Sequence, residues 1–189
     1  NIIVIAPNIK KRWSGVTSTI KNLIPIQKQK INIVSLGNKI SKEIDTLSFL
    51  DLLSLPKDKL IIWHARRNIE MLVGLVYKKI FNKNIKILFT SAAQRNHSKY
   101  TKWLISNMDA VIATSAKSGK YLDVPYEIIM HGINTNTYIP SNDKSKLRKE
   151  LNLPDGTLVG CFGRIRYQKG VDLFVNAMIQ SCKKNKNLY

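Results

Sequence analysis

The segment LVGCFGRIRYQKGVDLF, residues 158–174, indicates how the chain is built. Its first five residues, Leu158 to Phe162, are typical of a short buried strand, and from Val171 to Ile179 apolar residues recur at helical spacing. A loop with two glycines and three cations separates the two elements. Strand, cationic loop and helix in this order form half of a βαβ unit, so the segment predicts a parallel α/β sheet.

The same loop predicts an anion site. In open parallel sheets, ligands bind outside the carboxyl ends of the strands, where a helix N-terminus favours negative charge. Gly163 and Arg164 follow the expected strand, and Lys169 stands just before the expected helix. We therefore expect Arg164 and Lys169 to face one anion together.

The rest of the chain repeats this alternation of apolar strands and amphipathic helices. Such a pattern predicts an α/β fold of Rossmann-like type, with a parallel sheet covered on both faces. The expected strands are residues 2–6, 31–36, 60–63, 85–90, 109–113, 126–130 and 157–162, and the expected helices are residues 16–29, 69–82, 97–108, 115–122, 143–151 and 170–183.

Three segments follow from this pattern. Residues 1–133 are expected to form one Rossmann-like domain, and residues 134–156 form a polar interdomain linker that contains two prolines. Residues 157–189 are expected to begin a second α/β domain. One strand and one helix cannot bury their own apolar faces, so the sequence predicts that this second domain is incomplete.

Composition excludes two broad classes. The chain has 189 residues, of which 44% are hydrophobic, and it has no low-complexity tract, which argues against disorder. Its apolar runs are far shorter than the roughly 20 residues of a membrane-spanning helix. Cys161 and Cys182 form no CxxC pair, so free thiols in a reducing compartment are favoured over a zinc or redox site, and a cytoplasmic protein is expected.

The formal charge of +19 is the strongest compositional signal. It is typical of proteins that meet nucleic acid, an anionic membrane surface, or phosphorylated and carboxylated substrates, although general enrichment in solvated lysines explains it equally well. From His64 to Lys102 the only acidic residue is Glu70. This stretch predicts a basic face, made by Arg66, Arg67, Lys78, Lys79, Lys83, Lys86, Arg95, Lys99 and Lys102.

Two segments that follow strands carry further candidate site residues. In IIWHARRN, residues 61–68, Arg66 and Arg67 are expected to bind a carboxylate or phosphate, although pairing of one of them with Glu70 is the alternative. In APNIKKRWSGVTST, residues 6–19, Gly15 stands at a helix start and could admit an anion, but a plain loop capped by Ser14 is about as favoured.

A third such segment is FTSAAQRNHSKYTKWLISNM, residues 89–108. It contributes Arg95 as an anion-binding candidate and His97 as a proton or sugar-hydroxyl contact, with a capping or surface role for His97 as the alternative. On the expected helix Tyr100, Trp103, Leu104 and Met108 share one face, and core packing of that face is favoured over insertion of Trp103 into a membrane.

Several signatures of other chemistry are missing from the sequence. It has no DxD motif of the kind that binds a metal with a nucleotide sugar, no GxSxG, no HExxH and no GK[ST]. No metal site is therefore predicted.

These segments together resemble the retaining glycosyltransferases of family 4, which have the GT-B architecture of two Rossmann-like domains facing across a cleft. The resemblance is strongest to lipopolysaccharide core mannosyltransferases and covers nearly all of the chain. It rests on WHARRNIEML, FTSAAQRNHSKYTKWLI, DAVIATS, HGINTNTY and GCFGRIRYQKGVDLFVNAM.

The resemblance implies roles for individual residues. Arg164 and Lys169 match the basic pair that grips the donor diphosphate, beside Gly163, and Gly15 matches the glycine that approaches the donor phosphate and the acceptor. Many members carry a His directly after the strand that ends here at Phe89, but this chain has Thr90, with His97 as a substitute. The family's carboxylate-rich motif lies beyond Tyr189, so residues 1–189 alone are expected to be inactive.

The sequence thus predicts a metal-independent hexosyltransferase with no cofactor. It would transfer mannose from GDP-mannose, with retention, to an inner-core lipopolysaccharide acceptor held by Arg66, Arg67 and Arg95, while peripheral on the inner face of the cytoplasmic membrane. Two alternatives stay open: a related GT-B enzyme such as a nucleotide-sugar epimerase, and a basic nucleic-acid-binding module. The second is disfavoured because the chain lacks helix-turn-helix, RNA-binding and zinc signatures, so no nucleic-acid partner is expected.

Overall fold

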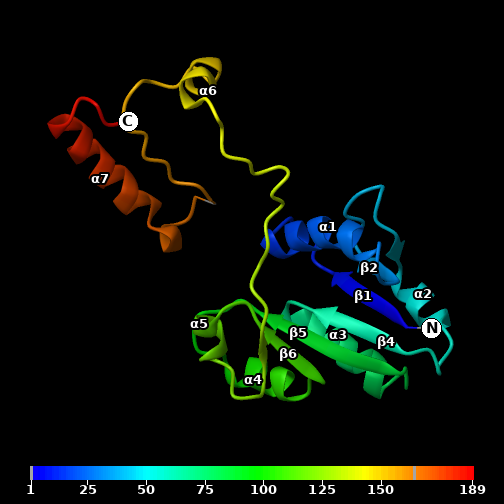
Figure 1. The fold of residues 1–189 in the computed structure, drawn as a ribbon. Coiled ribbons are helices and arrows are strands. Elements are labelled where there is room, and N and C mark those ends of the chain that lie inside the picture. Colours follow the sequence, from blue (N-terminus) through cyan, green and yellow to red (C-terminus); the bar gives the residue numbers. More distant parts are fainter. Residues whose placement is uncertain (1, 164) are drawn as a thin grey trace. The chain divides into compact units, whose positions relative to one another are not determined.

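A computed structural model describes residues 2–163 and 165–189. The chain divides into two compact units, Asn1–Gly132 and Ile133–Tyr189, which are described separately below. Figure 1 shows the order of their elements along the chain.

The first unit is built on a seven-stranded, entirely parallel sheet. The spatial order of its strands is β3-β2-β1-β4-β5-β6-β7, so the strand order reverses between β1 and β4. The strands are β1 (Ile3–Asn8), β2 (Ile33–Gly37), β3 (Thr46–Leu47), β4 (Ile61–Ala65), β5 (Ile85–Ser91), β6 (Ala110–Ala113) and β7 (Glu127–Ile128).

Five helices connect these strands, and the sequence-predicted alternation is confirmed with one addition. The helices are α1 (Gly15–Gln27), α2 (Phe49–Ser54), α3 (Asn68–Lys79), α4 (Lys99–Ser106) and α5 (Ala116–Gly119). Neither α2 nor the two-residue strand β3 was predicted. Helix α2 does carry a start signal, because Ser48 and Asp51 form a reciprocal capping box around its first turn.

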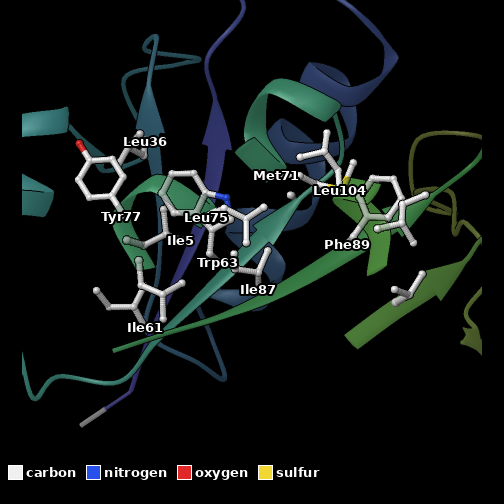
Figure 2. Close-up of a cluster of buried hydrophobic side chains, with 14 of the residues drawn as sticks. Ile5, Leu36, Ile61, Trp63, Met71, Leu75, Tyr77, Ile87, Phe89 and Leu104 are labelled. Atoms are coloured by element: carbon white, nitrogen blue, oxygen red, sulfur yellow. The ribbon is translucent and has the colours of Figure 1, made fainter. Parts of the chain in front are cut away.

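Two separate apolar clusters lie against the sheet, as expected for a parallel sheet covered on both faces. Along β1, Ile3 and Ile5 belong to the larger cluster while Val4 and Ala6 belong to the smaller one, because successive side chains point to opposite faces. Helix α1 contributes Ile20 and Ile24 to the smaller cluster. Helices α3 and α4 cover the larger cluster, which Figure 2 shows around Trp63, Met71 and Leu104.

A glycine allows α3 to lie close to the sheet. A Cβ atom at Gly74 would stand 2.8 Å from Cδ1 and Nε1 of Trp63, so only glycine fits there without a shift. The indole Nε1–H of the fully buried Trp63 donates a 2.8 Å hydrogen bond to the carbonyl of Glu70. Helix α3 is therefore anchored directly over the end of β4, which fixes the position of the residues between them.

The second unit contains α6 (Lys144–Glu150), a 3-10 turn η1 (Tyr167–Lys169) and α7 (Val171–Lys184). Helix α6 lies in the segment predicted as a linker, and α7 agrees with the predicted helix of residues 170–183. Arg148 of α6 donates 2.8 Å hydrogen bonds to the carbonyls of Pro154 and Gly156, which ties this helix to the chain that follows.

The predicted strand at residues 157–162 is wrong. Only Thr157 forms a bridge, in parallel with Leu188, and the side chain of Phe162 is 96% exposed. The physical reason is that a single pair of short strands is at best marginally stable unless further strands pair with it or a helix packs on it. Among the described residues of the second unit, none of the apolar side chains is fully buried.

Candidate active site

The candidate site lies where β4 and β5 of the first unit end. These two strands pair in parallel with His64 opposite Leu88 and Ala65 opposite Phe89, so the residues after them emerge at the same edge of the sheet. A pocket of about 590 Å³ opens there, and we call it the β4–β5 pocket. Its lining comes from both strand ends and the loop before α4: Arg66, Asn68, Phe89, Thr90, Ser91, Ala92, Ala93, Arg95, Asn96, His97, Ser98 and Thr101.

Three of the predicted site residues, Arg66, Arg95 and His97, line this one pocket. They come from two separate loops of the sequence, and the parallel pairing of β4 with β5 brings those loops together. The pocket therefore offers two guanidinium groups and an imidazole to one ligand. Two cations beside a neutral hydrogen-bonding ring suit a ligand that has both an acidic group and hydroxyls.

Arg66 is held by contacts of both its side chain and its backbone. Its guanidinium Nη2 lies 3.1 Å from Nδ1 of His64, and its backbone N–H donates a 2.8 Å hydrogen bond to Oε2 of Glu70. Burial is the main cause that lowers the pKa of Arg66 to about 10, which Glu70 partly offsets. The group stays charged near neutral pH, and its partial burial makes it a strong partner for an anion.

His64 lies behind the pocket and reaches across to the neighbouring strand. Its Nε2 is 2.7 Å from Oγ1 of Thr90, the first residue after Phe89. Burial, followed by the nearby charge of Arg66, lowers the pKa of His64 to about 3. The imidazole is therefore neutral at physiological pH.

Arg67 does not line the β4–β5 pocket, and its guanidinium is bonded to other protein groups. Its Nη1 forms a 2.8 Å ion pair with Oε1 of the fully buried Glu70, and its Nη2 donates to the hydroxyls of Ser14, at 2.6 Å, and Thr17, at 3.1 Å. This pairing is the alternative that the sequence left open. The three contacts tie the start of α1 to the start of α3, and the prediction that Arg67 binds an acceptor anion stays untested.

Gly15 opens α1 on the same unit. The predicted cap is confirmed, because the Ser14 hydroxyl accepts a hydrogen bond from the backbone N–H of Thr17 at 3.4 Å. A Cβ atom at Gly15 would meet nothing within 4 Å, and the residue has no positive φ. Neither packing nor backbone conformation therefore calls for glycine here, and the exposed backbone of the first turn is open to a ligand.

His97 stands between two hollows of the first unit. It lines the β4–β5 pocket and also a neighbouring pocket of about 260 Å³ beside Trp103 and Leu122. Its Nε2 is buried and has no hydrogen-bond partner among the described residues. Burial is the largest cause that lowers its pKa, and the charges of Arg95 and Lys102 lower it further against a smaller opposing effect of Asp123.

The predicted diphosphate residues lie in the second unit. Lys169 ends η1 with its side chain exposed, and Gly170 follows in the left-handed conformation with φ of +65° before α7 begins. Gly163 has φ of +145° and open space where a side chain would stand. Arg164 lies outside the described residues, so its predicted role is carried by the sequence alone.

The expected aromatic core face of α4 is wrong in part. Leu104 is fully buried, but Tyr100 and Trp103 are 49% and 51% exposed, and their rings stack with centroids 6.3 Å apart. Helix α4 instead packs Thr101 and Ile105 inward beside Leu104, because these three residues stand at i, i+4 and i+3 and share one face of the helix. The two aromatic rings therefore form an exposed apolar surface on α4.

The nine clustered cations do not share one face. Lys83 and Lys86 lie near the start of β5, whereas Arg95 follows its end, and seven strand residues separate these points by about 20 Å. Several are also engaged, because Lys78 pairs with Asp109 at 2.6 Å and the buried ammonium of Lys83 donates to the carbonyls of Leu53 and Leu55. Of these nine cations, Arg66 and Arg95 line the β4–β5 pocket, whereas Lys102 lines the neighbouring pocket and pairs with Asp123 at 2.6 Å.

The described residues contain neither a candidate membrane span nor a candidate metal cluster. None of their helices has both the length and the apolar character that a membrane crossing requires. They also contain no cluster of three or more His, Cys, Asp or Glu side chains with the spacing of a metal site.

Comparison with known proteins finds two curated relatives that are described as mannosyltransferases. It is 48% identical over 185 residues to the lipopolysaccharide core biosynthesis mannosyltransferase LpcC of Rhizobium leguminosarum bv. viciae, and 48% identical over 187 residues to LpsB of Rhizobium meliloti (strain 1021), which has the same description. Each match covers 95% of this chain and 53% of the relative. The chain thus spans about half the length of these curated relatives. No protein-family model matches it.

Solved structures agree on the fold. Two crystal structures of Anabaena Alr3699/HepE, one with UDP and glucose and one with UDP-glucose, match with TM-scores of 0.69 and 0.70. They are 16% identical in sequence and cover 95% and 94% of this chain, and 58% and 57% of theirs. The resemblance seen in the sequence is confirmed: the fold of this chain matches part of a GT-B glycosyltransferase, and both curated relatives are described as lipopolysaccharide core biosynthesis mannosyltransferases.

Proposed function

We propose that this chain forms the acceptor-side domain and the beginning of the donor-side domain of a lipopolysaccharide core mannosyltransferase. The observation that carries the proposal is the 48% identity that extends over 95% of the chain to two enzymes of that description. The donor in this proposal is GDP-mannose, and the acceptor is an inner-core sugar that bears a carboxylate or phosphate.

The acceptor is assigned to the β4–β5 pocket. Arg66 and Arg95 supply positive charge at its lining, and His97 supplies a hydrogen-bonding ring that burial and two neighbouring cations keep neutral. Each charge-assisted hydrogen bond to an acidic group contributes about 1.5–3 kcal/mol. An acceptor that lacks its acidic group would therefore bind considerably more weakly than the intact one.

The donor diphosphate is assigned to Lys169 and Arg164 in the second unit. In the first unit, taken by itself, Gly15 leaves the start of α1 open to an anion. In the proposed mechanism Lys169 and Arg164 stabilise the charge that develops on the leaving diphosphate. The same leaving oxygen accepts the acceptor's proton on the face that it vacates, which gives retention without a protein nucleophile or a metal ion.

We also propose that the enzyme is peripheral on the inner face of the cytoplasmic membrane. Exposed Tyr100 and Trp103 on α4 stand beside Lys99 and Lys102, and aromatic rings flanked by lysines are typical of surfaces that bind anionic lipid. Such a position would place the pocket near a lipid-linked acceptor. The basic charge is assigned to this surface and to the substrates, and not to nucleic acid.

A product assay tests the proposal. Full-length protein containing this chain is incubated with radiolabelled GDP-mannose, UDP-glucose and other nucleotide sugars, with and without a core oligosaccharide acceptor. We expect mannosylated oligosaccharide whose new linkage has the α configuration of the donor. A free sugar released without any acceptor would indicate an epimerase-type reaction, and a preference for another nucleotide sugar would reject the donor assignment.

A further inference from the structure

The inference concerns Thr90 and the partly buried imidazole of His64, which contacts it. Thr90 is the residue directly after Phe89 in β5, and it lines the β4–β5 pocket. His64 approaches the same hydroxyl from β4, at 2.7 Å, and does not itself line the pocket. Which of the two groups donates the hydrogen bond in this contact decides whether the Thr90 hydroxyl can donate a hydrogen bond to a ligand.

Arg66 determines which nitrogen of His64 carries the proton. A guanidinium group has N–H donors and no acceptor, so the 3.1 Å contact between Arg66 Nη2 and His64 Nδ1 requires Nδ1 to accept. A neutral imidazole has one N–H, which must then be on Nε2. Nε2–H therefore donates to Oγ1 of Thr90, and the reverse direction is excluded because Nε2 has no free lone pair.

The hydroxyl of Thr90 consequently keeps its own proton for another acceptor. Among the described residues no protein group accepts it, and the space in front of Thr90 is the pocket. Because the Thr90 hydroxyl already accepts a hydrogen bond from His64, it is available to donate its own proton to a ligand in the pocket. Beside Arg66, the atom that it suits is an uncharged oxygen of a ligand that also has an anionic group.

We infer that the Thr90 hydroxyl donates a hydrogen bond to a hydroxyl oxygen of a substrate sugar in the β4–β5 pocket, and that His64 is a positioning residue that sets the direction of this donor. The inference rests on the proposed function in one respect, namely that the pocket receives a sugar substrate. That sugar belongs either to the nucleotide-sugar donor or to the acceptor, and the test separates the two.

Calorimetric binding to full-length protein provides that test, with GDP-mannose and a deacylated core oligosaccharide as probes. Thr90→Val removes the hydroxyl at nearly constant size, and Thr90→Ser keeps it. We expect Thr90→Val to weaken one probe by about threefold to tenfold, the range of a single neutral hydrogen bond, and Thr90→Ser to bind both probes like the wild type. The probe that weakens identifies the source of the sugar.

A second measurement follows His64 directly. The ¹⁵N spectrum of the His64 ring should show the neutral Nε2–H form from pH 5 to 8, in wild type and Thr90→Ser alike. A ring protonated on Nδ1, or on both nitrogens, would overturn the assigned direction. Equal binding of both probes by Thr90→Val and wild type would overturn the sugar contact, as would a wild type that binds neither probe. Normal binding with no sugar transfer would reject only the proposed function.

Discussion

The guanidinium of Arg67 lies 2.8 Å from the carboxylate of Glu70, whose side chain is completely buried. This ion pair joins the residue before α3 to the third residue of that helix, and Arg67 continues from it to Ser14 and Thr17 of the α1 start. The pair therefore connects the loop that contains Gly15 to the end of β4. A buried carboxylate without its partner would carry an uncompensated charge.

Removal of Arg67 should destabilise the fold strongly. We expect Arg67→Met to lower the free energy of unfolding by about 3–5 kcal/mol, because it leaves Glu70 buried and unpaired. The double variant Arg67→Met with Glu70→Gln should lose less, since a neutral amide then replaces the buried carboxylate. Urea unfolding of residues 1–189 measures both. The control is Lys28→Met, which removes an exposed pair with Asp45 worth about 0–1 kcal/mol. Equal losses in Arg67→Met and the control would contradict the role of the buried pair.

Gly15→Ala should separate stability from activity. The added methyl group meets no atom within 4 Å and the backbone needs no positive φ, so we expect the free energy of unfolding to rise by about 0.4–1 kcal/mol. The same methyl group stands where the donor phosphate would approach, so kcat/KM of the full-length enzyme should fall at least about tenfold. The matched control is Gly74→Ala, whose Cβ would collide with Trp63 and cost stability. Unchanged kinetics in Gly15→Ala would show that no ligand approaches this turn.

The buried His64 should make the fold sensitive to mild acid. Its pKa is about 3 in the folded chain and 6.5 as a free side chain, so below pH 6.5 only the unfolded chain takes up this proton. Stability from this site is therefore complete above pH 6.5 and decreases as the pH falls toward 3, by about 1.4 kcal/mol per pH unit within that window.

The measurement is urea unfolding at pH 7, 6, 5 and 4 for wild type and His64→Gln. We expect the difference in unfolding free energy between the two proteins to shrink steadily below pH 6.5, because glutamine does not titrate. Parallel pH profiles would mean that His64 can accept its proton inside the folded chain, which would contradict the neutral, buried imidazole.

Membrane binding should depend on the exposed rings of α4. We expect the double variant Tyr100→Ala with Trp103→Ala, and separately Lys99→Glu, to reduce sedimentation with phosphatidylglycerol vesicles, since each lysine near an anionic surface contributes about 1 kcal/mol. Trp13→Ala is the matched aromatic control, because Trp13 is 53% exposed on another part of the first unit. Lys79→Glu is the matched charge control, because Lys79 ends α3 and contacts Asn107 after the opposite end of α4. Equal losses in the controls would assign the binding to net charge alone.

The sequence pattern was sufficient for the sheet but not for the second unit. Strands β1, β2, β4, β5 and β6 are short apolar runs, and each pairs with neighbours on both sides, so local composition and final environment agree. Residues 158–162 have the same composition and remain outside any strand, because the only pairing that the structure gives this segment is short, from Thr157 and Val159 to residues 187–189. The spacing of apolar residues indicates which side chains of a segment would be buried in a strand. It does not indicate whether other strands are available to pair with that segment.

The candidate site was likewise predicted from the sequence only in part. The sequence analysis assigned Arg66 and Arg95 to one acceptor because each follows an expected parallel strand, and the structure places both in one pocket. The sequence offered pairing of Arg66 or Arg67 with Glu70 as an alternative, but it could not show that Arg67 is the one that pairs, because that depends on the packing of α3. Nor could the contact of His64 with Thr90, which depends on the register of two strands that are 26 residues apart at these positions.

The most direct test of the account is mannose transfer by full-length enzyme in the presence of EDTA, compared between wild type and Lys169→Ala. We predict mannosylated core oligosaccharide from GDP-mannose at an undiminished rate in EDTA, and a rate at least about a hundredfold lower in Lys169→Ala, since loss of one preorganised charge commonly costs that much. Lys183→Ala, at the other end of α7, should keep the wild-type rate. Absence of mannosylated product, inhibition by EDTA, or a wild-type rate in Lys169→Ala would contradict the proposed mechanism.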